Sequence, residues 1–495
     1  MTDTAASDSV LGTKPRLVDL ATGRTSSFIS PEILTDLVRA GEFALTAVAG
    51  FAVFETYVNS TGFEERAPYL VVASLAGLAV IVAFAALRLY GVSAFTQPIR
   101  LLPRLWLGWT IVFAFLTAAA FFLKVGPEFS RVWLLTWYAA GGIALLAGRI
   151  VLAQAVSGWL DAGRLQRRAV IIGGGEPASA LIRALESDRS NEIRICGIFD
   201  DRTPERLGTA AAGYPHLGTI DDLVEFGRKS RVDMLIVSLP MHAENRLLQV
   251  FRKLWVLPVD IRLSAHMSKL NFRPRAYSYI GSVPFIDIAD RPIANWSFIL
   301  KWLFDKTIAL LALIALAPVM LAVAAAVRFD SRGPVLFRQK RFGFNNELIE
   351  VFKFRSMYVD QSDADAARLV TRGDPRVTRV GRFIRKTSLD ELPQLFNVLT
   401  GQLSLVGPRP HALQAKAADR LYQDVVDGYY ARHKVKPGLT GWAQINGWRG
   451  ETDTAEKIQR RVEHDLYYIE NWSVFLDLYI LFMTPFALLK AENAY

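Results

Sequence analysis

The sequence predicts a membrane α + α/β protein with four transmembrane helices, a Rossmann-like parallel α/β domain, and a re-entrant-helix α/β catalytic domain lying on the membrane. Three observations predict this class. Apolar runs of membrane-spanning length fill the first third, β-rich runs alternate with helical patterns in the middle, and a fifth apolar run precedes the last third. The mean hydropathy of +0.23 is high for a soluble protein of 495 residues. The expected segments are a flexible tail (1–35), a transmembrane unit (36–160), a Rossmann-like domain (166–265), a linker (266–298) and a catalytic domain (299–495).

The net charge of +10 fits three kinds of partner: nucleic acid, anionic lipid and small anionic substrates. The apolar runs favour the last two, so we expect membrane lipids and an anionic substrate, and no nucleic acid. The single cysteine, Cys196, excludes an internal disulfide and a cysteine-based zinc site. No cleavable signal peptide is visible, and the polar N-terminal residues predict a flexible tail.

The first four apolar runs lie near 40–58, 69–90, 105–123 and 132–155, and each is long enough to cross a bilayer core. Trp and Tyr lie near their ends, as interfacial residues do. Arg residues flank the second loop and follow the fourth run, which predicts that both ends of this unit face the cytoplasm. The alternative is a set of buried helices in a soluble protein.

The middle segment contains Gly173-Gly174-Gly175-Glu176-Pro177-Ala178, which matches G-x-G-x-x-[GA] after an expected strand. Further strands are expected at 193–199, 232–239 and 259–264, so the pattern predicts a parallel sheet. One interpretation is a nucleotide site, with phosphate at the start of the following helix. The alternative is a degenerate domain whose glycines only form the turn. No Tyr-x-x-x-Lys pair lies in this segment, and no cofactor is assigned to it.

A fifth apolar run, 308–327, has basic residues on both sides, such as Lys306 and Arg328. Pro318 lies in its middle, where it removes a helical hydrogen bond and bends the axis. Because positive charge favours the cytoplasmic side, both flanks are expected on the same side. The pattern predicts a re-entrant helix over 305–328 that bends at Pro318; a plain fifth crossing is the alternative.

The last third predicts strands at 334–339 and 349–354 and a helix over 388–399. A final apolar segment, 473–489, is interrupted by two residues that do not suit a membrane crossing, Asp477 and Pro485. This segment predicts helices that lie on the membrane surface, with a core helix pair as the alternative.

Two adjacent carboxylates, Asp390 and Glu391, begin the expected helix over 388–399, between the basic residues Arg385 and Arg409. A carboxylate pair surrounded by cations suits phosphoryl chemistry, in which a metal and guanidinium groups hold charge on phosphate oxygens. The helix start is expected to lower the pKa of Asp390 and keep it ionised at pH 7. The alternative is a capping box formed by Ser388 and Glu391.

The last third also carries a family resemblance in six motifs: Phe304-Asp305, PVLFRQ at 334–339, FKFRSM at 352–357, SLDELPQLFNV at 388–398, LVGPRP at 405–410 and RHKVKPGLTGWAQING at 432–447. From Lys301 onward the chain closely resembles the bacterial sugar transferases, also called monotopic phosphoglycosyl transferases. The whole chain resembles the large members, of the undecaprenyl-phosphate glucose phosphotransferase type, in which the N-terminal half is a non-catalytic appendage.

The resemblance implies transfer of hexose-1-phosphate, with glucose as the expected hexose, from a UDP-hexose to undecaprenyl phosphate with release of UMP. Asp390 corresponds to the family's nucleophile, which forms a covalent aspartyl-phosphosugar intermediate, and Glu391 corresponds to the ligand of the Mg²⁺ cofactor. Substrate-phosphate contacts are expected at Arg385, Arg409, Lys353 and Arg355, and other substrate contacts at Pro410, Gln444 and Asn446. For Lys353 and Arg355, a solvated basic face is the alternative.

The resemblance also implies a multi-pass protein of the bacterial cytoplasmic (inner) membrane, with its catalytic domain on the cytoplasmic face. The reaction would be the first membrane step of exopolysaccharide, capsule or O-antigen repeat-unit synthesis. Other polysaccharide assembly enzymes and a second copy, in a homodimer, are the further expected partners. One residue departs from the family, whose re-entrant helix bends at a Ser-Pro pair where this chain has Ala317-Pro318.

Two other functions are open at this point. One is a membrane-anchored nucleotide-sugar dehydratase or epimerase that works at the Rossmann-like domain, and the other is a scaffold for polysaccharide assembly. The residues do not determine which hexose is used, because C4 epimers differ only in one or two hydroxyl contacts.

Overall fold

The computed structural model divides the chain into a helical unit, 24–167 with 186–194, and a larger unit that holds 168–185 and 195–495. The structure describes residues 30–59, 66–187, 193–202, 213–230, 232–240, 243–265, 278–280, 283–359, 374–411, 416–417, 420–421, 426, 429–448 and 454–490. The expected flexible tail therefore lies almost wholly outside the described residues.

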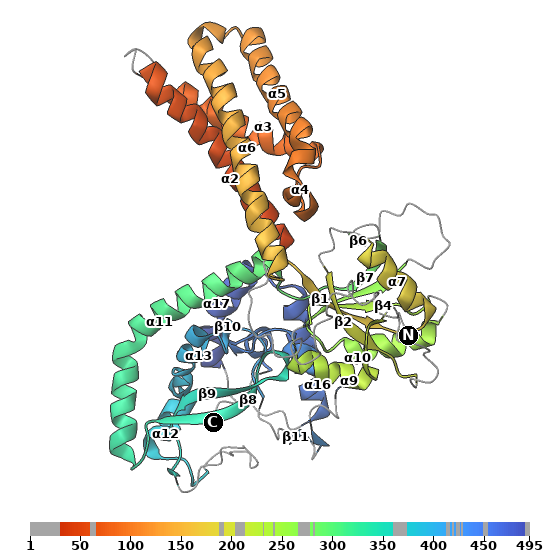
Figure 1. The fold of residues 1–495 in the computed structure, drawn as a ribbon. Helices are drawn as coiled ribbons and strands as arrows, with labels where there is room; N and C mark the ends of the chain where they lie inside the picture. Colours follow the sequence, from red (N-terminus) through yellow and green to blue (C-terminus); the bar gives the residue numbers. More distant parts are fainter. Residues whose placement is uncertain are drawn as a thin grey trace, which may run out of the picture. The chain divides into compact units, whose positions relative to one another are not determined.

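The helical unit contains four long helices (Figure 1). They are α2 (Pro31–Val53, extended by the π-helix Phe54–Val58), α3 (Arg66–Ala86), α5 (Pro98–Phe122) and α6 (Arg131–Asp161). The short helices α4 (Val92–Thr96) and η3 (Gly126–Glu128) lie in the connections. Each long helix covers one of the predicted apolar runs.

Aromatic side chains form the core of the helical unit. Trp109, Trp133 and Trp137 are fully buried there. The indole N–H of Trp133 donates to the carbonyl of Gly50 at 2.8 Å, and that of Trp137 donates to the carbonyl of Thr46 at 3.1 Å. These bonds satisfy the indole donors inside an apolar bundle, where an unpaired donor is costly.

Among the described residues, five helices are long and apolar enough to cross a membrane: the four above and α11 (Asn295–Asp330). The predicted class, a membrane α + α/β protein, is confirmed. The number of crossings and the re-entry of the fifth helix stay predictions.

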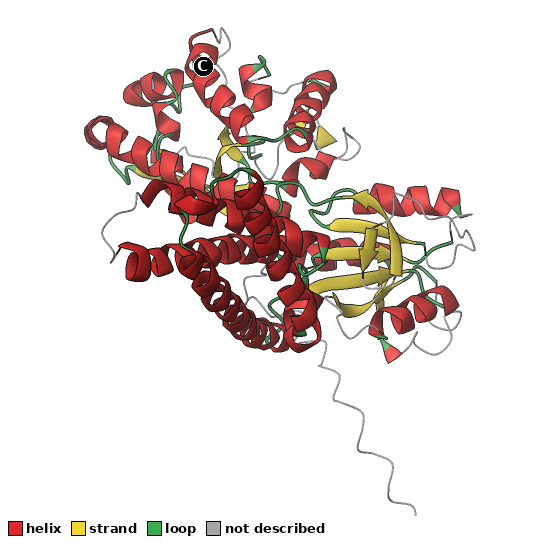
Figure 2. Ribbon diagram, turned by 90° about the horizontal axis from the view of Figure 1, so that it is seen from above, coloured by secondary structure: helices red, strands yellow, loops and turns green. Residues whose placement is uncertain are grey.

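The larger unit begins with a seven-stranded sheet in the order β3-β2-β1-β4-β5-β7-β6. Its strands are β1 (Arg167–Ile172), β2 (Ile193–Phe199), β3 (His216–Gly218), β4 (Met234–Val237), β5 (Asp260–Ser264), β6 (Ser278–Ile280) and β7 (Val283–Ala289). Helices α7 (Glu176–Glu186), α9 (Ile220–Lys229) and α10 (Glu244–Leu254) accompany the sheet, and helices lie on both of its sides in Figure 2. The pairs β2–β3, β1–β4 and β4–β5 are parallel, as predicted.

The sheet extends further than the sequence suggests. Two strands, β6 and β7, lie in the segment that was expected to be a linker, and β7 pairs antiparallel with both β5 and β6. Pro284 lies inside β7, and a proline within a run argues against an assignment as a strand. The buried side chains of Val283 and Phe285 nevertheless pack this strand onto the core.

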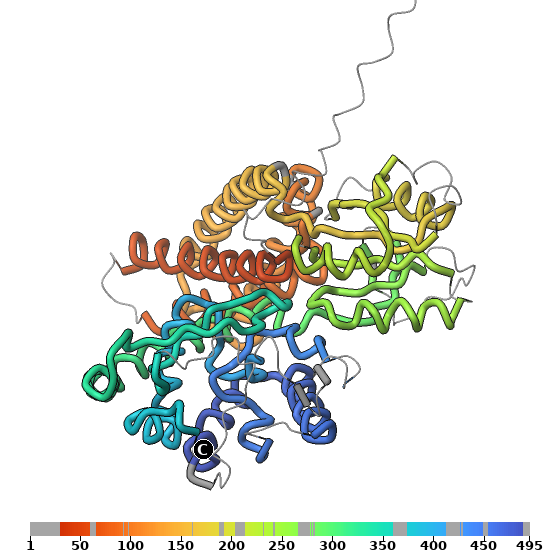
Figure 3. Tube along the Cα trace, turned by 90° about the horizontal axis from the view of Figure 1, so that it is seen from below, coloured from red at the N-terminus to blue at the C-terminus, as the bar shows by residue number. Residues whose placement is uncertain are grey.

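The segment predicted to be the catalytic domain runs from the green to the blue end of the tube in Figure 3 and begins with α11. This helix continues through Pro318 and bends along its length (Figure 1). One face carries buried Ala309, Val323 and Val327, whereas Ile314 and Leu321 on other faces are exposed. The helix is thus apolar on its open side as well, as a membrane-embedded helix is.

Short elements follow α11. β8 (Leu336–Phe342) and β9 (Leu348–Phe354) form an antiparallel hairpin, and β10 (Ser404–Val406) pairs parallel with β13 (Gly438–Thr440). The hairpin agrees with the two predicted strands. The remaining elements are η5 (Phe344–Asn346), α12 (Arg379–Lys386), η7 (Leu389–Glu391), α13 (Gln394–Thr400), β11 (Lys416–Ala417), β12 (Arg420–Leu421), η8 (Tyr429–Lys434), α15 (Trp442–Ile445), α16 (Ala455–Glu470) and α17 (Val474–Lys490).

The apolar C-terminal segment is one helix, α17, which continues through Pro485. It has a packed face and an open face. Asp477 and Ile480 are fully buried, whereas Phe475 and Phe482 are 83% and 68% exposed. Asp477, which interrupts the apolar pattern, therefore faces the core of the domain.

Candidate active site

The two carboxylates lie in a short 3₁₀ turn, η7, between α12 and α13. The predicted single helix over 388–399 is wrong. Ser388 adopts a left-handed conformation (φ 60°, ψ 16°) that ends α12, and Pro393 stands at the N-cap of α13. Ser388 makes no capping hydrogen bond with its side chain. The capping-box alternative is therefore wrong as well, and the Glu391 carboxylate is used elsewhere.

Glu391 is held by two cations from different elements. Its Oε1 accepts from Lys353 Nζ of β9 at 2.9 Å and from Arg409 Nη2, beyond β10, at 2.7 Å. Its Oε2 contacts Arg409 Nη1 at 3.4 Å. Burial alone would raise the pKa of Glu391, but the charges and hydrogen bonds of Arg409 and Lys353 hold it well below its usual range. Glu391 is thus an anion across the physiological range.

Asp390 has the opposite shift. Asp390 is 9% exposed, and its burial is the main cause that raises its pKa to about 6. The charge of Lys353 lowers this pKa, and the neighbouring charge of Glu391 raises it. The charges of Arg385 and Arg409 have smaller lowering effects on this pKa. The prediction that a helix start lowers this pKa is wrong, because η7 has only three residues and desolvation dominates. With a pKa of about 6, most of the Asp390 population is still ionised at pH 7.

The four predicted phosphate-binding cations are not all in one place. Lys353 and Arg409 bind Glu391, and Arg385, in the last turn of α12, acts through its charge on Asp390. Arg355 is buried, and its guanidinium donates to the main-chain carbonyls of Val327, Ser331 and Arg332. The structure therefore uses Arg355 to hold the C-terminal end of α11 rather than to surround the carboxylates.

The predicted substrate contacts lie after β10 and β13: Pro410 follows β10, Gln444 lies in the short helix α15, and Asn446 is at the end of α15. The carbonyl of Pro410, next to Arg409, accepts from Arg341 Nη1 at 3.1 Å. Gln444 Nε2 donates to the Leu439 carbonyl at 3.4 Å, and its Oε1 is buried without a hydrogen-bond partner among the described residues. Asn446 Nδ2 donates to the Trp442 carbonyl at 2.8 Å.

A fully buried amide aligns the carboxylates with Lys353. Asn397 of α13 accepts from the main-chain N–H of Phe352 at 2.9 Å and donates to the carbonyl of Glu350 at 2.7 Å. It also donates to Gln402 Oε1 at 2.8 Å. These bonds fix α13 against β9, and hence η7 against Lys353. The sequence reasoning did not single out Asn397, although it lies in one of the family motifs.

Two buried ion pairs support the loop of Arg409. Arg432 pairs with Asp465 at 2.6 Å and donates to the carbonyl of Arg409 at 2.9 Å. Lys301 Nζ pairs with Asp477 at 2.7 Å and donates to the carbonyl of Val406 at 3.1 Å. The sequence analysis did not predict this role of Asp477. Its position as a lone charge in an apolar run could have indicated a buried ion pair.

In the Rossmann-like domain, the glycine turn is engaged by the chain itself. The main-chain N–H of Gly174 donates to Asp200 Oδ2 at 2.6 Å. Arg202 pairs with the same carboxylate at 2.6 Å and donates to the Gly174 carbonyl at 3.0 Å. An internal carboxylate thus uses a donor that a nucleotide phosphate would need. This arrangement favours the interpretation in which the glycines only form the turn.

Comparison with known proteins assigns families to both halves. The model of the family described as bacterial sugar transferase matches residues 296–491, and the model described as CoA-binding domain matches residues 85–265. The chain is 34% identical to the UDP-glucose:undecaprenyl-phosphate glucose-1-phosphate transferase of Xanthomonas campestris pv. campestris, over 97% of this chain and 100% of that one.

Two further relatives have related names. The UDP-glucose:undecaprenyl-phosphate glucose-1-phosphate transferase of Escherichia coli is 37% identical over 82% of this chain and 84% of that one. The undecaprenyl-phosphate glucose phosphotransferase of Komagataeibacter xylinus is 42% identical over 67% of this chain. The match spans 61% of the length of that relative.

Proposed function

The chain belongs to the bacterial sugar transferase family and is a phosphoglycosyl transferase, and from this premise we propose that it transfers glucose-1-phosphate from UDP-glucose to undecaprenyl phosphate. UMP is the other product. The names of the relatives from Xanthomonas campestris and Escherichia coli support these substrates. The observation that carries the proposal is the neighbouring pair of carboxylates, one buried and one bound by two cations.

Asp390 is the proposed nucleophile. One of its carboxylate oxygens attacks the β-phosphorus of UDP-glucose, and the bond from that phosphorus to the bridging oxygen breaks, so that UMP leaves with the electron pair. The glucose-1-phosphate is then held on Asp390 as an acyl phosphate. An oxygen of undecaprenyl phosphate attacks the same phosphorus and releases the Asp390 carboxylate. Such a split replaces one difficult displacement by two easier ones.

Cations offset the charge that opposes this attack. A carboxylate that approaches a diphosphate dianion meets like-charge repulsion. Lys353 and Arg409 reach Glu391 within hydrogen-bonding distance, and the charges of both, with that of Arg385, also act on Asp390. Diphosphate oxygens bound beside Asp390 would meet the same cations. Arg409 is suited to this because its planar fork can bind phosphate with two hydrogen bonds.

Mg²⁺ fits the site as an ion that takes most of its ligands from the substrate. Among the described residues, no three His, Cys, Asp or Glu side chains form a group able to hold a metal. Mg²⁺ is commonly held by one or two carboxylates together with substrate phosphates and waters. Glu391 Oε2, whose contact with Arg409 is as long as 3.4 Å, would supply the protein ligand. When bound, the ion would neutralise charge on the diphosphate.

The membrane arrangement is part of the proposal. α11 would be a re-entrant helix bent at Pro318, and the exposed aromatic side chains of α17 would rest on the same membrane surface. The carboxylates would then face the cytoplasm, which supplies UDP-glucose, at the level where the lipid acceptor presents its phosphate. The product would begin the repeat unit of an exopolysaccharide or a related polymer, and other assembly enzymes would extend it. A homodimer is part of the same expectation.

The test is UMP release by the purified full chain with Mg²⁺, UDP-glucose and undecaprenyl phosphate, compared with Asp390→Asn. We expect the variant to lose activity on the order of a thousandfold or more. Release with UDP-galactose or an N-acetylhexosamine donor instead would change the assigned sugar. Full activity of Asp390→Asn would remove the nucleophile from the proposal, and no release with any UDP-sugar would remove the function.

A further inference from the structure

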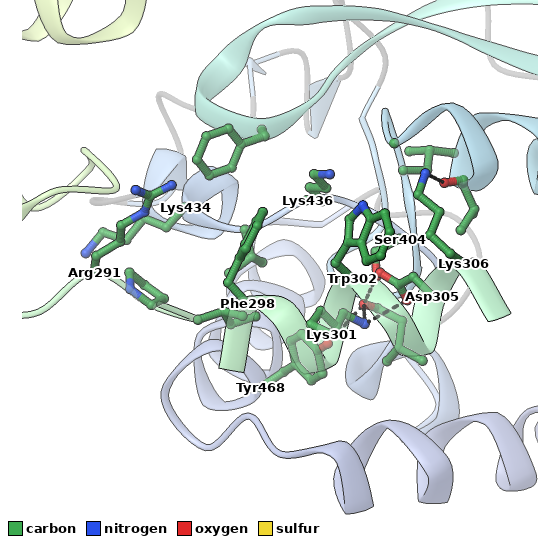
Figure 4. Close-up of a pocket in the computed structure, with 18 residues that line it drawn as sticks. Arg291, Phe298, Lys301, Trp302, Asp305, Lys306, Ser404, Lys434, Lys436 and Tyr468 are labelled. Atoms are coloured by element: carbon green, nitrogen blue, oxygen red, sulfur yellow. Dashed lines mark hydrogen bonds and ion pairs between the residues drawn. The ribbon is translucent and has the colours of Figure 1, made fainter. Parts of the chain in front are cut away.

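A second cationic pocket lies at the C-terminal end of α13, beside the first turns of α11 (Figure 4). Its cavity has a volume of about 100 Å³. Phe298, Trp302 and Lys306 follow one another at four-residue spacing, which places them on one face of α11. Figure 4 shows this face directed toward Lys436 across the pocket.

The pocket holds more positive than negative charge. Its lining includes Arg291, Lys301, Lys306, Lys434 and Lys436, and a single carboxylate, Asp305. Asp305 is already bound by Lys301, which also pairs with Asp477. In the part of the chain that the structure describes, no carboxylate pairs with the other four cations. Lys434 is buried, Lys306 and Lys436 are partly buried, and Arg291 is exposed. Removal of unbalanced charge from water is costly, so the pocket favours an anion beside the partly buried lysines.

Two of these cations converge on one point. Gly401 adopts a left-handed conformation (φ 88°) after α13, and it has no side chain to fill the space. A Cβ at this position would lie 3.5 Å from Lys306 Nζ and 3.6 Å from Lys436 Nζ. Lys306 also donates to the carbonyl of Val398 at 2.8 Å. The pKa of Lys436 is lowered, first by burial and then by the charge of Lys306. An anion between the two ammonium groups would relieve their repulsion.

The rim of the pocket is aromatic and belongs to a helix that suits a membrane. Phe298 and Trp302 are 48% and 49% exposed, and Trp296 nearby is 41% exposed. Trp is enriched where a membrane helix passes the headgroups. With α11 in the membrane as proposed above, the cations of the pocket would lie at the depth of the lipid phosphates.

The pocket is separate from the catalytic carboxylates. Asp390 and Glu391 precede α13, whereas Val398 and Gly401 of the pocket lie at its other end. Seven residues of helix extend over roughly 10 Å. A phosphate in this pocket would thus be bound away from the phosphorus that reacts.

We propose that this pocket binds the phosphate headgroup of a membrane lipid that is not the reacting acceptor, between Lys306 and Lys436. The bound lipid would hold the start of α11 at the membrane surface. This site is additional to the transfer reaction proposed above and does not require it.

The test measures binding of dihexanoyl phosphatidic acid to the full chain in detergent by calorimetry, for the unmodified protein and for the pocket variant Lys436→Gln. We expect the dissociation constant to rise about tenfold in this variant, since one charged contact to the phosphate is lost. Lys340→Gln, which removes one exposed charge on β8, is the matched control and should bind as before. If Lys436→Gln fails to fold, Lys436→Met replaces it, because it keeps the length of the side chain and removes only its charge.

Three results would overturn the proposal. Equal binding by the pocket variant and the Lys340→Gln control would show that the pocket does not hold the lipid. Displacement of the lipid by inorganic phosphate or UMP at equal concentration would make a soluble phosphate the ligand. A rise in the KM for undecaprenyl phosphate in the pocket variant would assign the pocket to the acceptor. Loss of UMP release in all variants, including the control, would concern the proposed function instead.

Discussion

At the scale of single residues, two adjacent carboxylates are driven in opposite directions by their surroundings. Glu391 is surrounded by donors, so its pKa lies well below the usual range. Asp390, one residue earlier, is desolvated by burial, and hydrogen bonds do not compensate for this, so its pKa is about 6. Pairs of titratable groups whose pKa values are pushed apart commonly have different chemical roles. This difference fits the proposed roles, with Asp390 as the nucleophile and Glu391 as the ligand of Mg²⁺.

The raised pKa of Asp390 predicts an acid limit on the first half-reaction. Attack requires the ionised carboxylate, so the rate of UMP release without acceptor should be constant above about pH 7. Below about pH 6 it should fall tenfold for each further pH unit, because burial raises the pKa of Asp390 to about 6. A single-turnover measurement with UDP-glucose avoids the titration of the lipid phosphate. A rate that stays flat down to pH 5 would contradict this prediction.

The same shift predicts that Asp390 destabilises the fold when it is ionised. The pKa of Asp390 is about 6 in the folded chain and about 3.9 in an unfolded one. Its contribution to the free energy of unfolding therefore becomes less favourable as pH rises from 4 to 6. At pH 7, Asp390→Asn should therefore raise the free energy of unfolding, by at most about 3 kcal/mol. Melting temperatures in detergent should differ at pH 7 and converge at pH 4. A difference that does not change with pH would exclude this cause.

Removal of the Glu391 charge should impair catalysis by releasing two cations. Glu391→Gln leaves Lys353 and Arg409 without their shared carboxylate, and both would move toward other acceptors. We expect a loss of about a hundredfold in the rate of UMP release and a higher Mg²⁺ concentration for half-maximal activity. Glu350→Gln is the control, because Glu350 is half exposed and its contact with Arg338 is long, at 3.7 Å. Equal losses in both variants would contradict the role of Glu391.

At the scale of elements, the sequence allowed the strands β8 and β9 to be predicted approximately, without their pairing, and the parallel core of the sheet from its regular apolar runs. It also allowed the two carboxylates and Arg409 to be singled out. The 3₁₀ turn of η7 could not be foreseen, since it depends on the left-handed Ser388 and on burial from other elements. The role of Arg355 depends on where α11 ends in space, which no local pattern contains.

Asn397 offers a test of how elements are aligned. Its side chain makes three buried hydrogen bonds that join α13 to β9 and to Gln402. Asn397→Leu has a similar volume but leaves the Phe352 N–H and the Glu350 carbonyl unpaired, so we expect a loss of about 2–4 kcal/mol in the free energy of unfolding. Thermal melting in detergent measures this loss. Gln402→Ala, which removes one of the bonds, should cost clearly less, and an equal cost would contradict the argument.

At the scale of the whole molecule, the proposed re-entry of α11 places both of its flanks on the cytoplasmic side. In a Cys196→Ala background, Arg291→Cys and Lys340→Cys put one thiol on each flank of the helix. Both thiols should react with a membrane-impermeant maleimide in inverted vesicles and not in spheroplasts. Labelling of one of them in spheroplasts would show a plain crossing and would contradict the re-entry.

The two ends of α11 are fastened to the same domain. Near its start Lys301 and Lys306 bond to Asp477, Val406 and α13, and near its end Arg355 holds three carbonyls. The helix therefore supplies structural groups to the site besides its apolar surface. A truncated chain that begins after α11 would lack the cations that secure α13 and the loop of Arg409. Deletion of the membrane segment would thus not yield a soluble enzyme, and solubility would have to come from substitutions on the exposed face of the helix.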